Sequence, residues 1–219
     1  MHRSRQTTAV LVAVLASSLA GLAQDPPRSK GYKTPQAVFA AYKEANNGHD
    51  WKTLFSLGTT AYQNAHLMRF AIGAAYSQDD SEHPGETRAY RAIVAKYGID
   101  WKEVRKLAED AQDGGDQNAF LVPLERMVDR IEKKAELFSE VSEFLLKASD
   151  PVAIVVHDLK NLAEKGSTAT GDSIETTVII ETATDQLTQR TSKRRLEGQL
   201  TSHLFFRRID GDWYLDVEK

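Results

Sequence analysis

The segment that most constrains the fold is residues 196–217, where Asp210-Gly211 separates two runs rich in β-branched and aromatic residues. An Asp-Gly pair readily adopts the positive φ angles that a two-residue type I′ turn needs at both central positions. Such a turn fixes the register of the flanking strands, so that Ile209 faces Asp212. The chain is therefore predicted to end in a β-hairpin.

This register sorts the side chains of the hairpin onto two faces. One face carries the pairs Arg208/Trp213, Phe206/Leu215 and Leu204/Val217, and the other carries Arg207/Tyr214, Phe205/Asp216 and His203/Glu218. The first face is mainly apolar, and each large side chain buried from it contributes about 1.5–3 kcal/mol. We therefore expect earlier helices to cover it, and we expect the mixed face, bearing Phe205 and Tyr214, to be available for pairing.

The period of the hydrophobic pattern changes at Asp150-Pro151. Before this point, apolar residues recur every three or four positions, which predicts helices, and after it they alternate, which predicts strands. Helices are expected over 34–48, 51–57, 60–76, 86–98, 100–112 and about 121–148, and strands over 153–165, 168–184, 194–209 and 212–218. The sequence thus predicts an α+β fold, with N-terminal helices packed on an antiparallel sheet of about four strands.

The N-terminus has the pattern of a secretory signal peptide. Arg3 and Arg5 precede an uncharged run over 7–23 that ends in small residues, so residues 1–23 are predicted to be cleaved and 24–33 to form a linker. The run is shorter than the ~20 apolar residues of a spanning helix. The chain has no cysteine for a lipid anchor or a disulfide. We expect an exported protein, periplasmic or secreted, with no membrane attachment after cleavage.

Charge and motifs argue against several functions. The formal net charge is −3, and the only basic run is 193–195, whereas nucleic-acid binding requires a concentrated basic surface. The sequence has no glycine-rich phosphate loop, nucleophile elbow or cysteine nucleophile, so no cofactor is indicated. The acidic segments 79–86 and 110–116 have spacings that fit no set of metal ligands, and no metal site is predicted.

Three features together resemble the nuclear-transport-factor-2-like superfamily. They are the Thr-Pro start of the first helix at residue 34, the link Asn-Gly-His-Asp-Trp over 47–51, and the terminal hairpin FFRRIDGDWYLDV. The resemblance covers about residues 34–78 and 150–219. It implies that a strongly bent antiparallel sheet wraps around N-terminal helices to form a cone with a pocket.

Residues 79–148 are longer than the usual insertion of this superfamily. We therefore expect a single domain over 34–219 that carries a helical insertion, which caps the pocket, fills it or lies beside it. The superfamily includes isomerases, cyclases, dehydratases and many binding modules, so the resemblance implies a fold more strongly than a function.

Four residues are predicted to bind a ligand. Tyr42 lies eight residues before Asp50, a placement similar to that of the oxyanion-donating tyrosine of ketosteroid isomerase, but no Asp or Glu matches the base of that enzyme. We interpret Tyr42 as a core tyrosine. In an unbroken ladder from a turn at Gly166-Ser167, His157 faces Thr176 and both point inward, as does Ser202. The predicted ligand-binding residues are Tyr42, His157, Thr176 and Ser202.

Three functions remain open at this point. The favoured one is an exported non-catalytic module that binds a small apolar molecule in the cone pocket, or that pairs through its sheet, for example as a homodimer. The second is a cofactor-free lyase or isomerase that uses Tyr42 and His157 as donor and base. The third is a purely structural domain. An enzyme would require at least two titratable groups that converge in one pocket.

Overall fold

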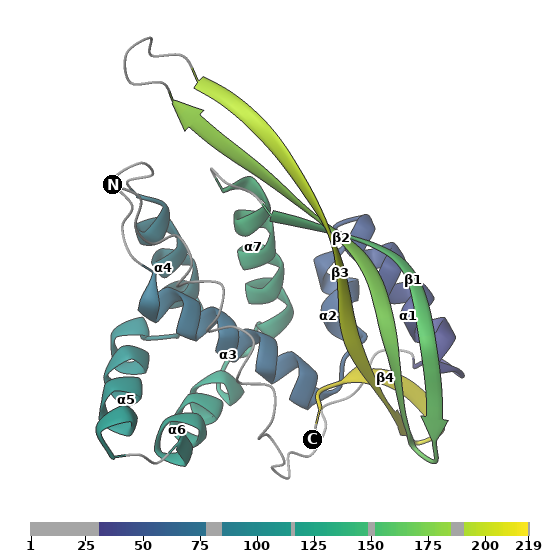
Figure 1. Ribbon diagram of the computed structural model, residues 1–219. Helices are drawn as coiled ribbons and strands as arrows, with labels where there is room; N and C mark the ends of the chain where they lie inside the picture. The colour runs from purple at the N-terminus through teal and green to yellow at the C-terminus, as the bar shows by residue number, and fades with distance from the viewer. Residues whose placement is uncertain (1–30, 78–84, 115–116, 149–151, 185–190, 219) are drawn as a thin grey trace.

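The computed structural model describes residues 31–77, 85–114, 117–148, 152–184 and 191–218. The predicted signal peptide, most of the linker and the acidic residues 79–84 lie outside these ranges. The chain has an α+β fold in which helices precede a four-stranded antiparallel sheet of order β1-β2-β3-β4 (Figure 1). The elements are α1 (Pro35–Asn47), α2 (Trp51–Ser56), α3 (Thr60–Tyr76), α4 (Glu86–Lys96), α5 (Trp101–Gly114), α6 (Gln117–Asp129), α7 (Lys134–Lys147), β1 (Val152–Lys165), β2 (Thr168–Thr184), β3 (Thr191–Ile209) and β4 (Asp212–Asp216).

The first helices begin at side-chain caps. Thr34 caps α1 and Asp50 caps α2, as the sequence predicts. The expected cap of the third helix is off by one residue, because Thr59 rather than Thr60 accepts the backbone hydrogen bond that starts α3. The Thr59 hydroxyl also donates to Asp216 of β4 over 2.6 Å. The start of α3 is therefore tied to the C-terminal hairpin.

The single long helix predicted over 121–148 is wrong, because the chain breaks between α6 and α7. The Asn64 amide of α3 donates to Asp129 over 2.8 Å and accepts from Lys134 over 2.9 Å, on the two sides of the break. Between them Ile131 is buried. Residues 130–133, where the chain breaks, contain no proline or glycine, so tertiary contacts rather than a helix-breaking residue account for the break. It lets α6 pack on α5 while α7 packs on α2 and α4.

The C-terminal hairpin has the predicted register over all of β4. The turn residues Asp210 and Gly211 have φ angles of 53° and 88°, as a type I′ turn requires. The two pairs expected beyond Asp216, which involve Val217 and Glu218, do not form because β4 ends there. On the apolar face, Phe206 and Leu215 are 1% and 0% exposed, so this face forms the core as predicted.

The mixed face of the hairpin is not free for pairing along β4, contrary to expectation. Tyr214 and Asp216 are both buried. The Arg207 guanidinium forms an ion pair with Asp216 at 2.6 Å. Residues before α1 run beside β4, where Tyr32 pairs with Trp213. Both faces of β4 are therefore covered by the chain itself.

The first hairpin turns at 166–167 as predicted, but its ladder is not continuous. Register shifts occur in β1 between 160 and 163 and between 156 and 158. His157 lies in the second bulge and is exposed, so the prediction that it points inward is wrong. Its Nε2 atom lies 2.9 Å from the Thr176 hydroxyl. The bulges thus place both residues away from the helix-facing side of the sheet.

The predicted faces of β2 are also reversed around Glu175. The buried alternate residues are Ala169, Gly171, Ser173 and Glu175, whereas the neighbouring Ile174 is only half-buried. A Cβ atom on Gly171 would lie 2.8 Å from Leu159 Cδ1, which shows how closely β1 packs there. Small residues on this face admit close packing, and their alternation places Glu175 among the buried side chains.

The C-terminal end of α1 fastens onto the edge of the sheet. Asn46 donates to the Ile154 carbonyl over 2.6 Å. The Asn47 amide donates to the Val156 carbonyl over 2.8 Å and accepts from the Val156 amide over 2.9 Å. These bonds satisfy backbone groups that an edge strand would otherwise expose, and they fix α1 against the sheet.

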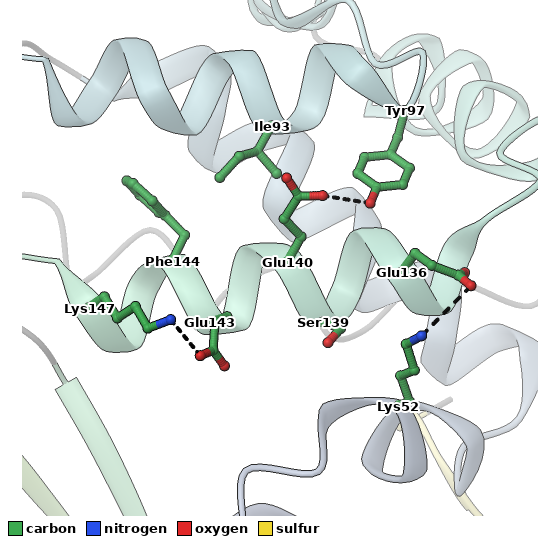
Figure 2. A pocket seen from close by; sticks show the side chains of 9 residues that line it. All are labelled: Lys52, Ile93, Tyr97, Glu136, Ser139, Glu140, Glu143, Phe144 and Lys147. Atoms are coloured by element: carbon green, nitrogen blue, oxygen red, sulfur yellow. Dashed lines mark hydrogen bonds and ion pairs between the residues drawn. The ribbon is translucent and has the colours of Figure 1, made fainter.

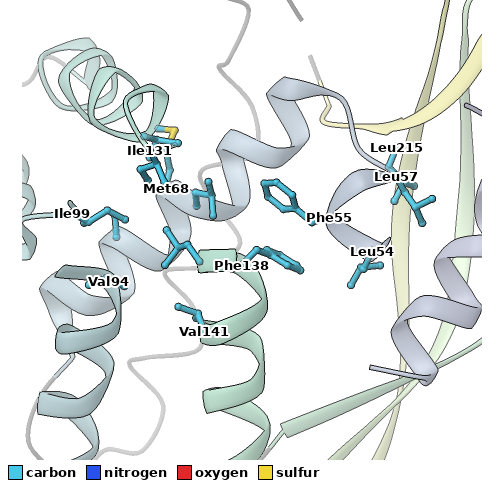
Figure 3. Close-up of a cluster of buried hydrophobic side chains, with 14 of the residues drawn as sticks. Leu54, Phe55, Leu57, Met68, Val94, Ile99, Ile131, Phe138, Val141 and Leu215 are labelled. Atoms are coloured by element: carbon cyan, nitrogen blue, oxygen red, sulfur yellow. The ribbon is translucent and has the colours of Figure 1, made fainter. Parts of the chain in front are cut away.

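The helices of the expected insertion share one hydrophobic core with the sheet side (Figure 3). Phe138 of α7 is buried, with its ring centroid 5.1 Å from that of Phe55 and 5.6 Å from that of Phe70. Val94 and Ile99 extend the same cluster toward α4 and α5. At the other end, β2 and β3 remain paired beyond β1 and project from the molecule (Figure 1).

Candidate ligand-binding site

A buried carboxylate lies between α1 and the sheet. Glu175 is 2% exposed. The Tyr42 hydroxyl donates to its Oε1 atom over 3.4 Å, and the Ser202 hydroxyl donates to its Oε2 atom over 2.9 Å. Burial raises the pKa of Tyr42 above its usual range, and Tyr62 and Glu175 raise it further. Tyr42 therefore remains a protonated donor.

The structure brings together two of the four predicted ligand-binding residues. Tyr42 and Ser202 meet at Glu175, whereas His157 and Thr176 contact each other on the other face of the sheet. Glu175, which the sequence did not single out, is the carboxylate that the Tyr42 hydroxyl contacts. The row of small residues on alternate positions of β2 was the signal that could have identified this buried face.

The arrangement around Glu175 is closed to substrates. A general base must come within hydrogen-bond reach of the proton that it removes. Glu175 is almost fully buried, and its two oxygens are each occupied by a donor from the same chain. Neither Glu175 nor Tyr42 lines the cleft described next. Among the described residues, this pair is part of the packing between α1 and the sheet.

A cleft of about 220 Å³ lies between α3 and the C-terminal strands. The α3 wall consists of Tyr62, Ala65, His66 and Arg69, which recur at helical spacing on one face. The opposite wall consists of residues 203–205 of β3 and 215–218 at the end of the described chain. Leu204, Phe205 and Leu215 make this second wall largely apolar.

Two polar side chains inside the cleft remain uncharged at neutral pH. Burial, followed by the nearby Arg69 cation, lowers the pKa of His66 to about 3. Burial raises the pKa of Tyr62 to about 12, against the opposing effect of Arg69. The His66 ring packs 4.5 Å from the Tyr62 ring and 5.6 Å from the Phe138 ring, measured between centroids. The aromatic contacts hold the His66 ring in place, and burial and Arg69 keep its imidazole neutral.

The polar atoms of these two residues are available to a ligand. Within the described part of the chain, no side chain or backbone group hydrogen-bonds to the Tyr62 hydroxyl or to the His66 ring nitrogens. Both residues are half-buried and line the cleft. Polar groups in such a position are normally satisfied by water or by a bound molecule. The cleft thus combines an apolar wall with two neutral polar groups.

His66 should make the stability of the protein depend on pH. Its pKa is depressed from about 6.5 in the unfolded chain to about 3 in the fold. Its stabilising contribution is therefore complete above about pH 6.5 and decreases as the pH falls toward 3. Between pH 7 and 5 the expected loss in free energy of unfolding is at most about 2 kcal/mol.

Urea unfolding at pH 7 and pH 5 tests this dependence. His66→Phe should reduce the difference between the two pH values, whereas His157→Gln, a change at an exposed histidine, should preserve it. An unchanged difference in His66→Phe would show that the imidazole of His66 is not held neutral in the fold.

A second, more open groove crosses α7 between α2 and α4 (Figure 2). Its carboxylates are already paired with neighbouring side chains. Glu140 accepts from Tyr97 over 2.6 Å and from Lys96 over 2.7 Å, and Glu143 forms an ion pair with Lys147 at 2.7 Å. These partners lower the pKa of both carboxyls. Because its charges are matched internally, this groove is a weaker candidate than the cleft on α3.

Metal sites and membrane-spanning helices are absent from the part of the chain that the structure describes. There, no three or more His, Cys, Asp or Glu side chains are grouped so that they could hold a metal ion. No described helix is both long and apolar enough to span a membrane. Residues 79–84 of the acidic segment, for which the sequence predicts no metal binding, lie outside this part of the chain. No family model and no curated protein matches the sequence.

Proposed function

We propose that the protein is a non-catalytic module that binds a small, largely apolar molecule in the cleft between α3 and the C-terminal strands. The observation that carries this proposal is the composition of the cleft. Leu204 and Phe205 provide the apolar wall, while the Tyr62 hydroxyl and the His66 nitrogens have no partner among the described residues. Ligand sites typically combine an apolar lining with a few polar groups that orient the ligand.

The titration of the cleft residues favours binding over catalysis. Efficient acid–base catalysis uses groups whose pKa lies near the working pH. His66, with a pKa of about 3, and Tyr62, with a pKa of about 12, both lie far from neutrality. The carboxylate of Glu175 is sealed beneath α1. Tyr62, His66 and Glu175 therefore do not supply the acid and base that the lyase or isomerase alternative needs.

The size of the cleft limits its ligand. Clefts that bury drug-sized molecules usually enclose about 300–1,000 Å³, and this one encloses about 220 Å³. It suits a molecule with one aromatic ring or a short branched aliphatic chain.

The proposal includes the superfamily and the export inferred from the sequence. The described part of the chain begins with three helices and ends in an antiparallel meander of curved strands (Figure 1). This order of elements supports the nuclear-transport-factor-2-like assignment. In this proposal the cleft takes the place of the cone pocket, because Tyr42 fills the space at Glu175. Export would place the module where it meets small molecules outside the cytoplasm.

Filling the cleft tests the proposed function. Ala65 lines the cleft on α3, so Ala65→Phe should occupy the volume that a ligand needs. With benzyl alcohol as a neutral probe, we expect saturable binding to the unaltered protein and at least about tenfold weaker binding to Ala65→Phe, equivalent to ~1.4 kcal/mol. Isothermal titration calorimetry measures both affinities.

Ala89→Phe is the matched control, because Ala89 is exposed on α4 and does not line the cleft. It should bind the probe as the unaltered protein does. Equal affinities in all three proteins, or no saturable binding to any, would contradict the proposed function.

A further inference from the structure

Arg69 is a cation at the cleft. Its side chain is exposed and lines the cleft, and no described residue forms an ion pair with it. By contrast, two other polar residues of the walls, Asp216 and His203, have partners within the described chain. Asp216 is bound by Arg207 at 2.6 Å, and the His203 ring lies 2.5 Å from Asp172. An unpaired guanidinium next to an apolar wall is suited to an anionic group.

The electrostatic effects of the charged residues inside the cleft also favour an anionic group. Arg69 lowers the pKa of Tyr62 more strongly than the buried Glu175 raises it, and it also lowers the pKa of His66. The remaining carboxylate of the wall, Glu218, belongs to an exposed residue near the end of the described chain. At the Tyr62 hydroxyl, therefore, the influence of the cation exceeds that of the nearest buried anion.

We propose that the ligand of this cleft is a small amphipathic acid, with a compact apolar body and one carboxylate. This inference rests on the proposed function. The Arg69 guanidinium and the Tyr62 hydroxyl donate to the carboxylate, and the apolar body lies along Leu204 and Phe205. A planar guanidinium matches a carboxylate with two parallel hydrogen bonds, so Arg69 selects for this end group.

The neutral state of His66 complements this assignment. A neutral imidazole can donate one hydrogen bond and accept another, and it adds no charge that would compete with Arg69. The ligand carboxylate thus meets one cation and two neutral polar groups. Lysine in place of Arg69 would keep the charge but lose the fork geometry, so the preference for a carboxylate depends on arginine.

Two probes with the same ring separate this inference from the proposed function. Benzoate carries the carboxylate, and benzyl alcohol carries a neutral hydroxyl on a similar body. In calorimetric titration, benzoate should bind at least about tenfold more tightly than benzyl alcohol. Arg69→Gln should weaken benzoate binding about ten- to a hundredfold and leave the affinity for benzyl alcohol unchanged. Arg88→Gln, which removes an exposed charge on α4 outside the cleft, should change neither affinity.

The outcomes are distinguishable. Equal affinity for both probes, or benzoate affinity that survives Arg69→Gln, overturns the assignment of an acid and leaves the binding module intact. A loss of benzoate affinity of the same size in Arg88→Gln also overturns it, because net charge alone would then explain the effect. If neither probe binds saturably, the proposed function fails together with the inference.

Discussion

Phe206→Ala is expected to lower the free energy of unfolding by about 3–5 kcal/mol, the usual cost of truncating a buried phenylalanine. Phe206 is 1% exposed and pairs across the hairpin with the fully buried Leu215. The alanine would leave a cavity in the core that holds the sheet against the helices, because the neighbouring secondary structure restricts its collapse.

Phe205→Ala is the matched control, because Phe205 is the adjacent residue and its side chain lies on the opposite face. It is half-buried and lines the cleft, so its truncation should cost clearly less. Urea unfolding of the two variants measures the difference. Equal losses would contradict the assignment of the two faces.

The second large effect is expected at the buried carboxylate. Tyr42→Phe removes one of the two side-chain donors to Glu175 and leaves the other, Ser202, in place. The O···O distance of 3.4 Å is longer than the usual range of about 2.5–3.0 Å for such a bond, so the free energy of unfolding should fall by about 0.5–1.5 kcal/mol. The phenylalanine ring fits the same space, which limits the effect to the hydroxyl.

A double-mutant cycle assigns this loss to the contact itself. In a Glu175→Gln background, Tyr42→Phe should cost less than in the unaltered protein, because the charge that the hydroxyl stabilises is gone. His157→Gln provides a control at an exposed site, and it should change stability by no more than about 0.5 kcal/mol. Additive effects of the Tyr42 and Glu175 changes would show that the two side chains do not interact in solution.

Features determined by local sequence were predictable. The Asp-Gly turn at 210–211 set the register of the final hairpin, and Thr34 and Asp50 marked the starts of the first two helices. Turn conformation and helix capping depend on a few neighbouring residues. The change from a helical to an alternating pattern near Asp150 also predicted the α+β class correctly.

Features that depend on distant contacts were not predictable. The bulge at His157 reverses the direction of that side chain, and no local pattern marks it. The break between α6 and α7 depends on Asn64, which is remote in sequence. On β2, alternation suggested that Glu175 was solvent-exposed, but its face is covered by α1. A one-residue change of register or face inverts such predictions.

The candidate site was predicted in part. Tyr42 and Ser202 were identified correctly as inward-facing polar residues, although they bind Glu175 rather than lining the cleft. Tyr62, His66 and Arg69 were not recognised, because α3 is apolar on most sides and was expected to be buried. The short β4 strand leaves one face of α3 uncovered, and this depends on where the hairpin ends.

The most direct test of the central claim is a map of backbone amide chemical shifts during titration with benzoate. Binding in the cleft predicts saturable shifts concentrated in residues 62–69, 203–205 and 215–218, the segments that form its walls. The amides of Tyr42 and Glu175 should remain unchanged, because this pair lies outside the cleft. Shifts centred on Tyr42 and Glu175, or the absence of saturable shifts in the cleft, would contradict the account.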